Sequence, residues 1–225
     1  MKREILITSD GSTTIHLPEW DEQYHSKHGA IQEAYHVFLR AGFDEIIKKN
    51  KKISILEIGF GTGLNAFITF LEATEKRIKI DYVGIEAYPI AATEVVKLNY
   101  VKELKASKEQ LVFDEMHALS WEEKHFVSEG FQLTKRKQFF EDIADKNIFE
   151  LIYFDAFGAK NQPELWTEDI FFRMYEAMKE NGILVTYSAK GSARRAMQAV
   201  GFSVERIPGP PGKREMLRAI KKAIL

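Results

Sequence analysis

The sequence predicts an α/β fold with a mostly parallel sheet and helices on both faces. Short apolar runs of strand length alternate with longer segments of helical periodicity through residues 53–207. These runs are continuously apolar, which is typical of parallel strands buried on both faces. The alternation of strands and helices favours crossover connections within one sheet.

The first residues are expected to cover this core. A hairpin is predicted over residues 3–17, with its turn at Asp10-Gly11, because strand-forming residues flank a turn dipeptide. Residues 29–49 have helical periodicity, although Gly42 is a potential break. The apolar face of this helix carries Ile31, Tyr35, Phe38 and Leu39.

The core elements follow in order. Strands are predicted at residues 53–58, 80–85, 149–154, 182–187, 202–207 and 215–219, and helices at 64–74, 90–100, 167–179 and 192–200. Residues 101–148 form the least regular part of the sequence. We expect a hairpin there, 130–137 followed by 138–143, whose second arm joins the sheet.

The composition is that of one globular domain. Apolar residues make up 45% and charged residues 29% of the 225 residues, which excludes a disordered chain. No linker or repeat divides the sequence, so residues 1–225 are predicted to form one domain, a cover (1–49) and a Rossmann-like core (50–225). Without an apolar run of about 18 residues or a signal-peptide pattern, a cytoplasmic protein, monomeric and without a membrane span, is expected. The absence of cysteine excludes disulfides, zinc–thiolate sites and a cysteine nucleophile.

Charge is distributed unevenly along the chain. Residues 186–225 contain nine Lys and Arg against two Asp and Glu, a net charge of +7, so the rest of the chain carries −8. A basic segment on an acidic protein suits contacts with phosphates. A solvated helix face with a charged tail explains the same composition, and charge alone favours that alternative.

A glycine-rich loop follows the first predicted strand of the core. Gly59, Gly61 and Gly63 lie between this strand and the next helix, where ligands bind in open α/β sheets. Their G-x-G-x-G spacing differs from the G-x-G-x-x-G of dinucleotide binders. Glu57 precedes the loop and suits an ammonium group, and Glu86, which ends the next strand, suits the two hydroxyls of a ribose. A tight strand–helix turn without a ligand is the alternative.

Together these features resemble class I S-adenosylmethionine-dependent methyltransferases, whose sheet is of the seven-stranded type. The resemblance implies that Glu57 and the loop hold the methionine and ribose of the cofactor and that Glu86 binds the ribose diol. The loop residues are Gly59, Phe60, Gly61, Thr62, Gly63 and Asn65. Asp142, after the third strand, would lie near the adenine amino group, with a surface turn as the alternative. An NAD-binding dehydrogenase is the rival interpretation, but it normally needs a second substrate domain.

Asp155 directly follows the apolar strand predicted at 149–154. A carboxylate there is partly desolvated and needs a partner. An amine nucleophile is one such partner, because a carboxylate orients it, accepts its proton and offsets the positive charge that grows on nitrogen. Capping of the following loop or helix is the alternative role. The absence of cysteine disfavours methylation through a cysteine adduct and fits direct transfer to nitrogen or oxygen.

Six stretches of the chain are similar to the methyltransferase module of the MnmC family, which also occurs alone as MnmD. They are Asp10-Gly11-Ser12, Tyr24-His25-Ser26, residues 29–39, Leu56 to Asn65, Asp155 to Trp166, and Gly212 to Leu217. The resemblance implies methylation of the aminomethyl group on carbon-5 of the wobble (2-thio)uridine in tRNA, with Asp155 as the catalytic carboxylate. Bifunctional relatives add a FAD-dependent oxidase domain, which is expected to be absent here, so FAD is not expected to bind. Relatives commonly have Asp-Gly/Ala-Phe-Ala-Pro where this chain has Asp155-Ala-Phe-Gly-Ala, which leaves open the conformation of Gly158–Gln162.

The same resemblance implies further contacts. Tyr24 and Glu33 lie in the matched N-terminal stretches and are expected to contact the cofactor, although a lone Glu on a helix is usually solvated. Phe157, Trp166 or Tyr187 would stack on the unpaired wobble base, with core packing as the alternative. The basic residues expected to bind phosphates of the anticodon stem are Lys190, Arg194, Arg195, Lys213 and Arg214. The six histidines lack metal-ligand spacing, and no metal is expected.

The sequence therefore predicts an S-adenosylmethionine-dependent tRNA methyltransferase. A small-molecule or protein N-methyltransferase is the alternative enzyme, and salt separates the two because tRNA binding weakens steeply with salt. A non-catalytic tRNA-binding module is the alternative outside enzymes. The intact set of Glu57 to Gly63, Glu86 and Asp155 argues against it.

Overall fold

The computed structural model describes residues 2–223, and its main sheet has eight strands in the order β10-β11-β9-β8-β4-β5-β7-β6. The strands are β4 (Lys52–Ile58), β5 (Lys79–Ile85), β6 (Lys124–Ser128), β7 (Phe131–Arg136), β8 (Phe149–Phe154), β9 (Met178–Thr186), β10 (Ser203–Pro208) and β11 (Glu215–Ile220). The central strands β7, β5, β4, β8 and β9 are parallel, and β6, β10 and β11 pair antiparallel with their neighbours. The predicted α/β class with a mostly parallel sheet is confirmed, with β6 as an eighth strand at one edge.

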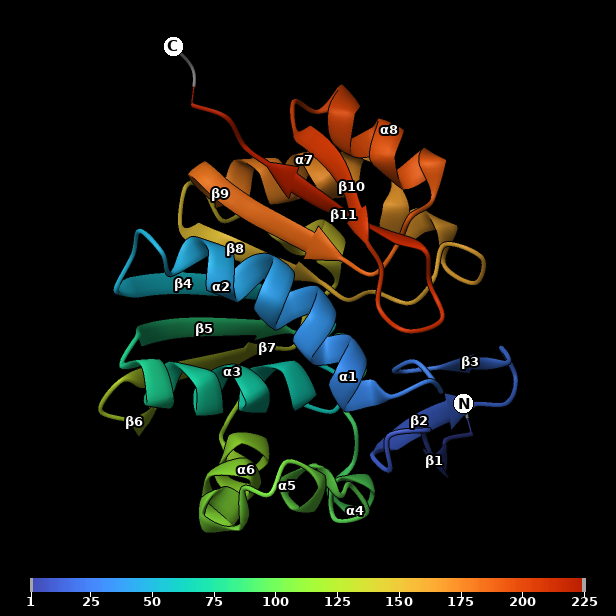
Figure 1. Cartoon of the computed structure of the whole chain (residues 1–225), viewed down its shortest axis with the longest axis vertical. Coiled ribbons are helices and arrows are strands. Elements are labelled where there is room, and N and C mark those ends of the chain that lie inside the picture. Colours follow the sequence, from blue (N-terminus) through green and yellow to red (C-terminus); the bar gives the residue numbers. More distant parts are fainter. Residues whose placement is uncertain (1, 224–225) are drawn as a thin grey trace.

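Helices cover both faces of this sheet (Figure 1). One face is covered by α3 (Leu64–Lys76) and by a continuous helix made of α1 (Ala30–Ala34), the π-helical stretch η1 (Tyr35–Phe43) and α2 (Asp44–Ile46). The other face is covered by α7 (Glu168–Ala177) and α8 (Gly191–Ala199). The shorter helices are α4 (Ala92–Val95), α5 (Tyr100–Glu103), η2 (Ser107–Glu109), α6 (Gln110–Ala118), η3 (Phe140–Asp142) and η4 (Pro163–Trp166).

The pattern of β4 shows how the sequence specifies two covered faces. Ile53 and Ile55 pack in the core beneath α3, whereas Leu56 and Ile58 pack in the core beneath α7 and α8. Successive side chains of a strand point to opposite faces, so a strand buried on both sides is apolar at nearly every position. The same alternation directs Glu57 toward the α3 face.

The break expected at Gly42 is absent, because the helix continues to Ile46. A Cβ atom at Gly42 would lie 3.0 Å from side-chain atoms of both Leu151 and Val185. This glycine therefore lets the helix approach β8 and β9 closely, and it has a packing role instead of a helix-ending one.

Two expectations between residues 90 and 148 were wrong. The helix predicted at 90–100 is divided, because Asn99 exchanges hydrogen bonds with Thr13 of the N-terminal hairpin: the Thr13 amide donates to Asn99 Oδ1 (2.8 Å) and the Asn99 amide donates to Thr13 Oγ1 (3.2 Å). The hairpin is β6–β7, and its second arm, which joins the sheet, ends at Arg136. The stretch predicted as that arm, 138–143, instead contains a short 3₁₀ turn.

The predicted N-terminal hairpin is confirmed. Strands β1 (Glu4–Ile7) and β2 (Thr13–Leu17) pair antiparallel, Gly11 has a positive φ of 86° in the turn, and β3 (Glu22–Gln23) adds a short third strand. This small sheet lies beyond the carboxyl ends of the parallel core strands (Figure 1). The cover therefore stands over the edge of the sheet where α/β proteins bind ligands.

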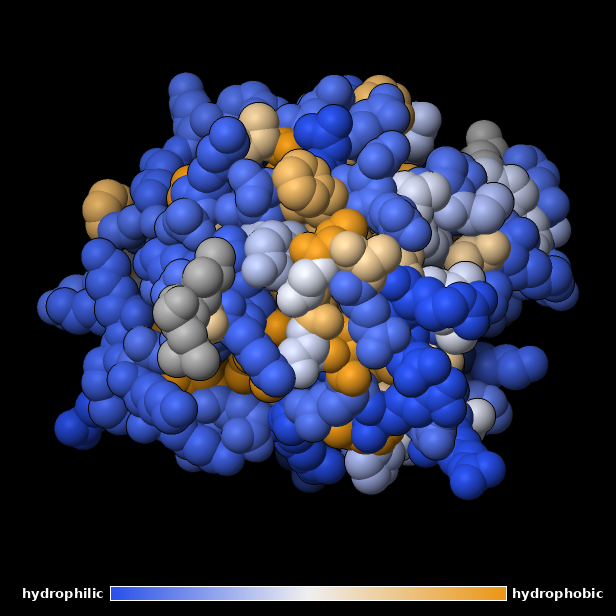
Figure 2. All heavy atoms as spheres, turned by 90° about the horizontal axis from the view of Figure 1, so that it is seen from above, coloured by the Kyte–Doolittle hydropathy of each residue, from blue (hydrophilic) through white to orange (hydrophobic). Residues whose placement is uncertain are grey.

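The surface agrees with the composition. Seen from above, it is mostly hydrophilic, and hydrophobic residues show through only in small groups (Figure 2). None of the helices within residues 2–223 is long and apolar enough to cross a membrane.

Candidate active site

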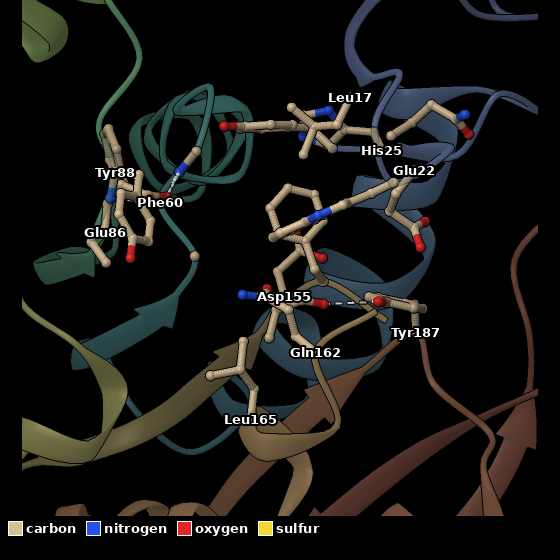
Figure 3. A pocket seen from close by; sticks show the side chains of 18 of the residues that line it. Leu17, Glu22, His25, Phe60, Glu86, Tyr88, Asp155, Gln162, Leu165 and Tyr187 are labelled. Atoms are coloured by element: carbon tan, nitrogen blue, oxygen red, sulfur yellow. Dashed lines mark hydrogen bonds between the residues drawn. The ribbon is translucent and has the colours of Figure 1, made fainter. Parts of the chain in front are cut away.

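A cavity of about 1120 Å³ opens at the carboxyl ends of β4, β5 and β8, beneath the N-terminal sheet. Because β4 has β5 on one side and β8 on the other, the cavity lies where the order of parallel strands reverses. This volume exceeds the range of about 300–1,000 Å³ for small-molecule sites, which leaves room for two ligands. Glu86 and Tyr88 line one side and Glu22 and Tyr187 the other, with Asp155 between them (Figure 3).

The glycine loop forms the floor of the cavity next to Asp155. Gly59 has a φ of 88°, and a Cβ atom there would lie 2.7 Å from the carbonyl oxygen of Asp155. Only glycine allows the loop to pass this close to the end of β8. Gly59, Phe60, Gly61 and Asn65 all line the cavity, as the sequence predicted for a ligand-binding loop.

Glu86 directly follows β5, and its carboxylate lies in the cavity wall. Its Oε2 accepts a hydrogen bond from the Gly61 amide (3.0 Å), and its Oε1 accepts one from the Tyr88 amide (2.9 Å). A carboxylate oxygen has two lone pairs, so each oxygen retains one for a ligand. The two backbone contacts hold the carboxylate in one orientation, which suits recognition of a diol.

Glu57 does not line the cavity, and the expectation that it holds a ligand's ammonium is corrected. Its side chain is fully buried on the α3 face, where it accepts hydrogen bonds from Asn65 Nδ2 (2.9 Å) and from the Tyr82 hydroxyl (2.8 Å). Burial raises the pKa of Glu57 well above its usual range. Glu57 therefore acts on the site through Asn65, which it orients from behind.

Asp155 and Glu57 share this asparagine. Asn65 Nδ2 also donates to Asp155 Oδ2 (2.9 Å), and the Asp155 amide donates to the Ile58 carbonyl (2.9 Å). Burial raises the pKa of Asp155 from 3.8 to about 7, and the negative charge of Glu33 adds to this, while Asn65 and the Lys213 charge lower it. A carboxyl group that titrates near neutral pH is suited to accept a proton. The sequence showed Asp155 but not its link to Asn65.

Aromatic rings surround the space in front of Asp155. The Phe157 ring centroid lies 5.1 Å from that of Tyr24 and 5.9 Å from that of Trp20, both edge to face. Burial raises the pKa of Tyr24 to about 12, so its hydroxyl stays protonated. Phe157, Tyr24 and Tyr187 line the cavity. Trp166 does not: it is 5% exposed and its Nε1 donates to the Phe157 carbonyl (2.8 Å), so core packing describes its role.

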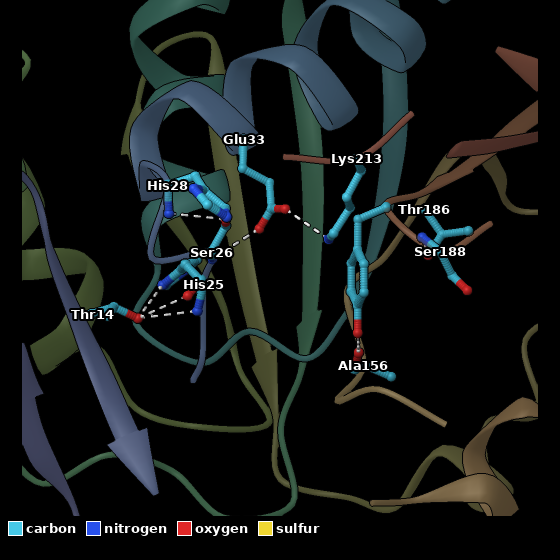
Figure 4. A network of polar contacts seen from close by, with 10 residues as sticks. Thr14, His25, Ser26, His28, Glu33, Ala156, Thr186, Ser188 and Lys213 are labelled. Carbon is cyan, nitrogen blue, oxygen red and sulfur yellow. Dashed lines mark hydrogen bonds and ion pairs between the residues drawn. The ribbon is translucent and has the colours of Figure 1, made fainter. Parts of the chain in front are cut away.

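Glu33 and Lys213 meet in the cavity wall, although 180 residues separate them. Lys213 Nζ lies 2.9 Å from Glu33 Oε2 and 3.9 Å from the centroid of the Tyr187 ring. The expected phosphate contact of Lys213 is therefore corrected, because its ammonium is held inside the site. Glu33, expected to contact a cofactor, also accepts the Ser26 amide at Oε1 (3.0 Å) (Figure 4).

The other predicted phosphate-binding residues lie outside the cavity. Lys190, Arg195 and Arg214 are exposed and Arg194 is half-buried. Because Thr186 of β9 pairs with Leu217 of β11, the segments that carry Lys190 and Arg214 flank the cavity edge of the sheet. Part of the basic segment is used structurally. Arg206 pairs with Glu215 (3.2 Å), Arg218 with Glu205 (2.6 Å), and the buried Lys221 donates to two backbone carbonyls.

Asp142 is exposed and does not form part of the cavity wall, which corrects its predicted contact with adenine. Because β7 ends at Arg136, earlier than expected, Phe139, Phe140 and Glu141 reach the cavity instead. The Phe139 and Tyr88 rings lie 6.0 Å apart, edge to face, and are 50% and 64% exposed. Neither of these two exposed rings at the cavity mouth was among the predicted site residues.

Two other loop residues and one histidine complete the wall or its support. Thr62 and Gly63 lie behind the wall, and Thr62 Oγ1 accepts a hydrogen bond from the Tyr100 hydroxyl (3.1 Å). His25 lines the cavity, and burial lowers its pKa to about 4, so its ring is neutral. Residues 2–223 contain no cluster of ligands that could hold a metal.

The loop after Asp155 is pinned from the N-terminal sheet. Asn161 Nδ2 donates to Glu22 Oε2 (2.6 Å), and the amides of Asn161 and Gln162 donate to the Gly158 carbonyl (2.9 and 3.1 Å). These contacts define the conformation that the sequence left open. This chain holds the loop through a side chain of β3.

Comparisons with known proteins agree with this site. A family model described as S-adenosyl-L-methionine-dependent methyltransferase matches residues 137–222. The tRNA 5-methylaminomethyl-2-thiouridine biosynthesis bifunctional protein MnmC of Cupriavidus metallidurans is 28% identical over 95% of this chain and 33% of that protein. The protein of the same name from Hydrogenovibrio crunogenus is 25% identical over 96% of this chain and 33% of its own length. This chain therefore spans about a third of the length of these curated relatives.

The solved structure of MNMC2 from Aquifex aeolicus matches with a TM-score of 0.75 and 26% identity, over 100% of this chain and 72% of that one. The chain is thus similar, over nearly its whole length, to MnmC-type methyltransferases. Spermidine synthase from Thermotoga maritima, with a TM-score of 0.60 and 13% identity over 99% of this chain and 70% of its own, shares the fold.

The cavity fits S-adenosyl-L-methionine. Glu86 retains acceptors for a ribose diol, Gly59 and Gly61 leave the space that side chains would fill, and Tyr88 and Phe139 offer exposed rings to a flat base. When bound, S-adenosyl-L-methionine supplies an electrophilic methyl group on a sulfonium. The remaining chemistry falls to the residues around Asp155.

Proposed function

We propose that this chain methylates the 5-aminomethyl group of a wobble uridine or 2-thiouridine in tRNA, giving the 5-methylaminomethyl product. The observation that carries the proposal is the Asp155 carboxyl group, which lines the cavity with a pKa of about 7 and is oriented by Asn65. The names of the relatives supply the nucleoside class.

An alkyl amine needs such a group. Its pKa resembles that of lysine, about 10.4, so it arrives as an ammonium ion without a free lone pair. Ionised Asp155 attracts the ammonium, accepts one of its protons and leaves the nitrogen lone pair free to take the methyl group. The product is a secondary ammonium ion, which stays protonated at neutral pH, and the proton on Asp155 departs to solvent before the next turnover. Before the proton transfer, the negative charge of Asp155 holds the incoming ammonium in place.

The rings in front of Asp155 suit an unpaired base. Bases extruded from a loop are recognised by stacking on aromatic side chains, with contributions of about 1–3 kcal/mol per base. Of the rings that line the cavity, Phe157 is the closest in sequence to Asp155, with Tyr24 and Trp20 beside it. We assign Phe157 the stacking role and Tyr24 a share of both the base and cofactor sites.

The exposed cations beside the cavity suit the RNA backbone. Lys190, Arg195 and Arg214 are exposed, and the segments of Lys190 and Arg214 flank the cavity edge of the sheet. We assign these three residues, with Arg194, to phosphates of the anticodon stem. Their contribution is expected to be electrostatic, independent of sequence and steeply salt-dependent.

The test is a methyl-transfer assay with labelled S-adenosyl-L-methionine and bulk tRNA from cells that lack this gene. Label in 5-methylaminomethyl-uridine or its 2-thio form, after digestion, is the expected result. Cofactor binding without label in any tRNA nucleoside would overturn the acceptor assignment and favour a small-molecule or protein acceptor. The absence of cofactor binding would favour a non-catalytic tRNA-binding module.

A further inference from the structure

Three charged side chains from distant parts of the chain meet at one end of the cavity. Glu33 comes from α1, Asp155 from the end of β8, and Lys213 from the loop before β11. Of the three, only Asp155 belongs to the proton transfer proposed above. Glu33 is 8% exposed, and a carboxylate as buried as this is costly unless it is paired.

A chain of contacts joins the ion pair to the residue next to Asp155. Glu33 Oε2 pairs with Lys213 Nζ (2.9 Å), and that ammonium lies 3.9 Å from the Tyr187 ring centroid. The Tyr187 hydroxyl donates to the carbonyl of Ala156 (2.8 Å). Figure 4 shows Glu33 and Lys213 pointing toward each other, with Ala156 below them. The N-terminal helix and the C-terminal loop are thus tied to the backbone that carries Asp155.

We propose that Glu33 and Lys213 form a positioning pair that sets the charge around Asp155 and selects an acceptor that arrives as an ammonium ion. The inference rests on the proposed function in one respect, which is that Asp155 meets the acceptor. With Asp155 ionised, two carboxylates face one ammonium, so one negative charge is left over. A single ammonium ion from the acceptor neutralises it.

None of the other polar groups around Asp155 supplies the missing positive charge. These groups are Glu57 and Tyr82 behind Asn65, Glu86 after β5, Glu22, Tyr24 and His25 from the cover, and Tyr187 after β9. The tyrosines and His25 are neutral at physiological pH, since burial raises the pKa of the tyrosines and lowers that of His25. Glu22 is bound to Asn161, and Glu86 to two backbone amides.

Opposite effects of the two partners make the pair testable. The Glu33 charge raises the pKa of Asp155 and the Lys213 charge lowers it. Lys213→Met should therefore move the acid limb of kcat/KM for tRNA to higher pH, and Glu33→Gln should move it to lower pH. A shift of roughly one pH unit is expected in each case, because charges nearby change a pKa by about 1–3 units. The double variant should return the limb close to its wild-type position, and Lys213→Arg should preserve it.

A structural role alone predicts a different outcome. If both single variants reduce kcat but leave the acid limb in place, the pair only supports the fold and the proposal is overturned. The same holds if the Kd for S-adenosyl-L-methionine rises while the KM for tRNA stays unchanged, because the pair then serves the cofactor. In the single variants, we expect the KM for tRNA to rise about tenfold while the Kd for the cofactor stays unchanged. A tenfold rise is the size of effect expected for the loss of one modest charge contact.

The failure of the proposed function would give a separate signal. If wild-type protein transfers no methyl group to tRNA, the acceptor assignment fails by itself. The carboxyl ¹³C resonance of Asp155, titrated by NMR in protein loaded with S-adenosylhomocysteine, then reads the pair directly. Opposite displacements of its titration midpoint in Lys213→Met and Glu33→Gln support the inference, and equal midpoints refute it.

Discussion

Replacing Asp155 with asparagine should slow methyl transfer strongly and yet stabilise the protein. Asparagine keeps the shape of the side chain, and its amide oxygen still accepts the hydrogen bond from Asn65 Nδ2, which spans 2.9 Å in the native site. It cannot accept the proton of an amine, so turnover should fall about 10²–10⁴-fold, the usual contribution of a general base.

The gain in stability follows from the burial of a carboxyl group. The pKa of Asp155 rises from 3.8 to about 7 on folding, so folding favours the neutral form. The stability associated with that form is complete below about pH 3.8 and is lost as the pH rises through about 7. At about 1.4 kcal/mol per unit, the loss reaches at most about 4 kcal/mol by pH 8 and about 1.7 kcal/mol by pH 5. Asn at position 155 does not titrate and avoids this loss.

Urea unfolding of wild type and Asp155→Asn at pH 5 and pH 8 measures the difference. We expect the advantage of the variant to grow by about 2–3 kcal/mol between these two values. Asp114→Asn is the matched control, because Asp114 is exposed on α6 and outside the cavity wall. An advantage that is the same at both pH values would refute the reasoning, since Asp155 would then ionise as easily in the folded protein as in water.

Three further substitutions test other parts of the site. Glu86→Ala should weaken S-adenosyl-L-methionine binding about 10–100-fold in calorimetry, because it removes a charged acceptor; an unchanged Kd would exclude the diol contact. Gly59→Ala should displace Asp155, whose carbonyl would lie 2.7 Å from the new Cβ, and lower kcat more than cofactor affinity; wild-type kcat would show that the loop yields. Trp166→Ala should reduce the free energy of unfolding by about 3–5 kcal/mol, because it empties a core site beneath Phe157; a loss below about 1 kcal/mol would contradict core packing.

Local patterns were sufficient for the parts of the site that follow directly from strand ends. The carboxyl ends of parallel strands meet at one edge, so Gly59, Glu86 and Asp155 had to lie near one another once β4, β5 and β8 were recognised. Their roles then followed from chemistry. Asp142 was misplaced because the strand before it ends at Arg136, seven residues before the end of the expected hairpin arm, so its neighbours reach the cavity instead.

Side-chain partners across the fold could not be predicted in this way. A lysine in a basic C-terminal segment looks like a phosphate ligand, and only the antiparallel placement of β11 beside β9 brings Lys213 over Tyr187 and against Glu33. Glu57 was assigned to a ligand because it precedes the glycine loop. Its side chain instead points to the α3 face of β4, where it accepts a hydrogen bond from Asn65. In both cases the charged side chain was expected to contact a ligand, and the structure pairs it with another residue of the protein. The electrostatics of Asp155 therefore depend on contacts between the two ends of the chain, and substitutions far from β8 in sequence should change its proton affinity as much as substitutions beside it.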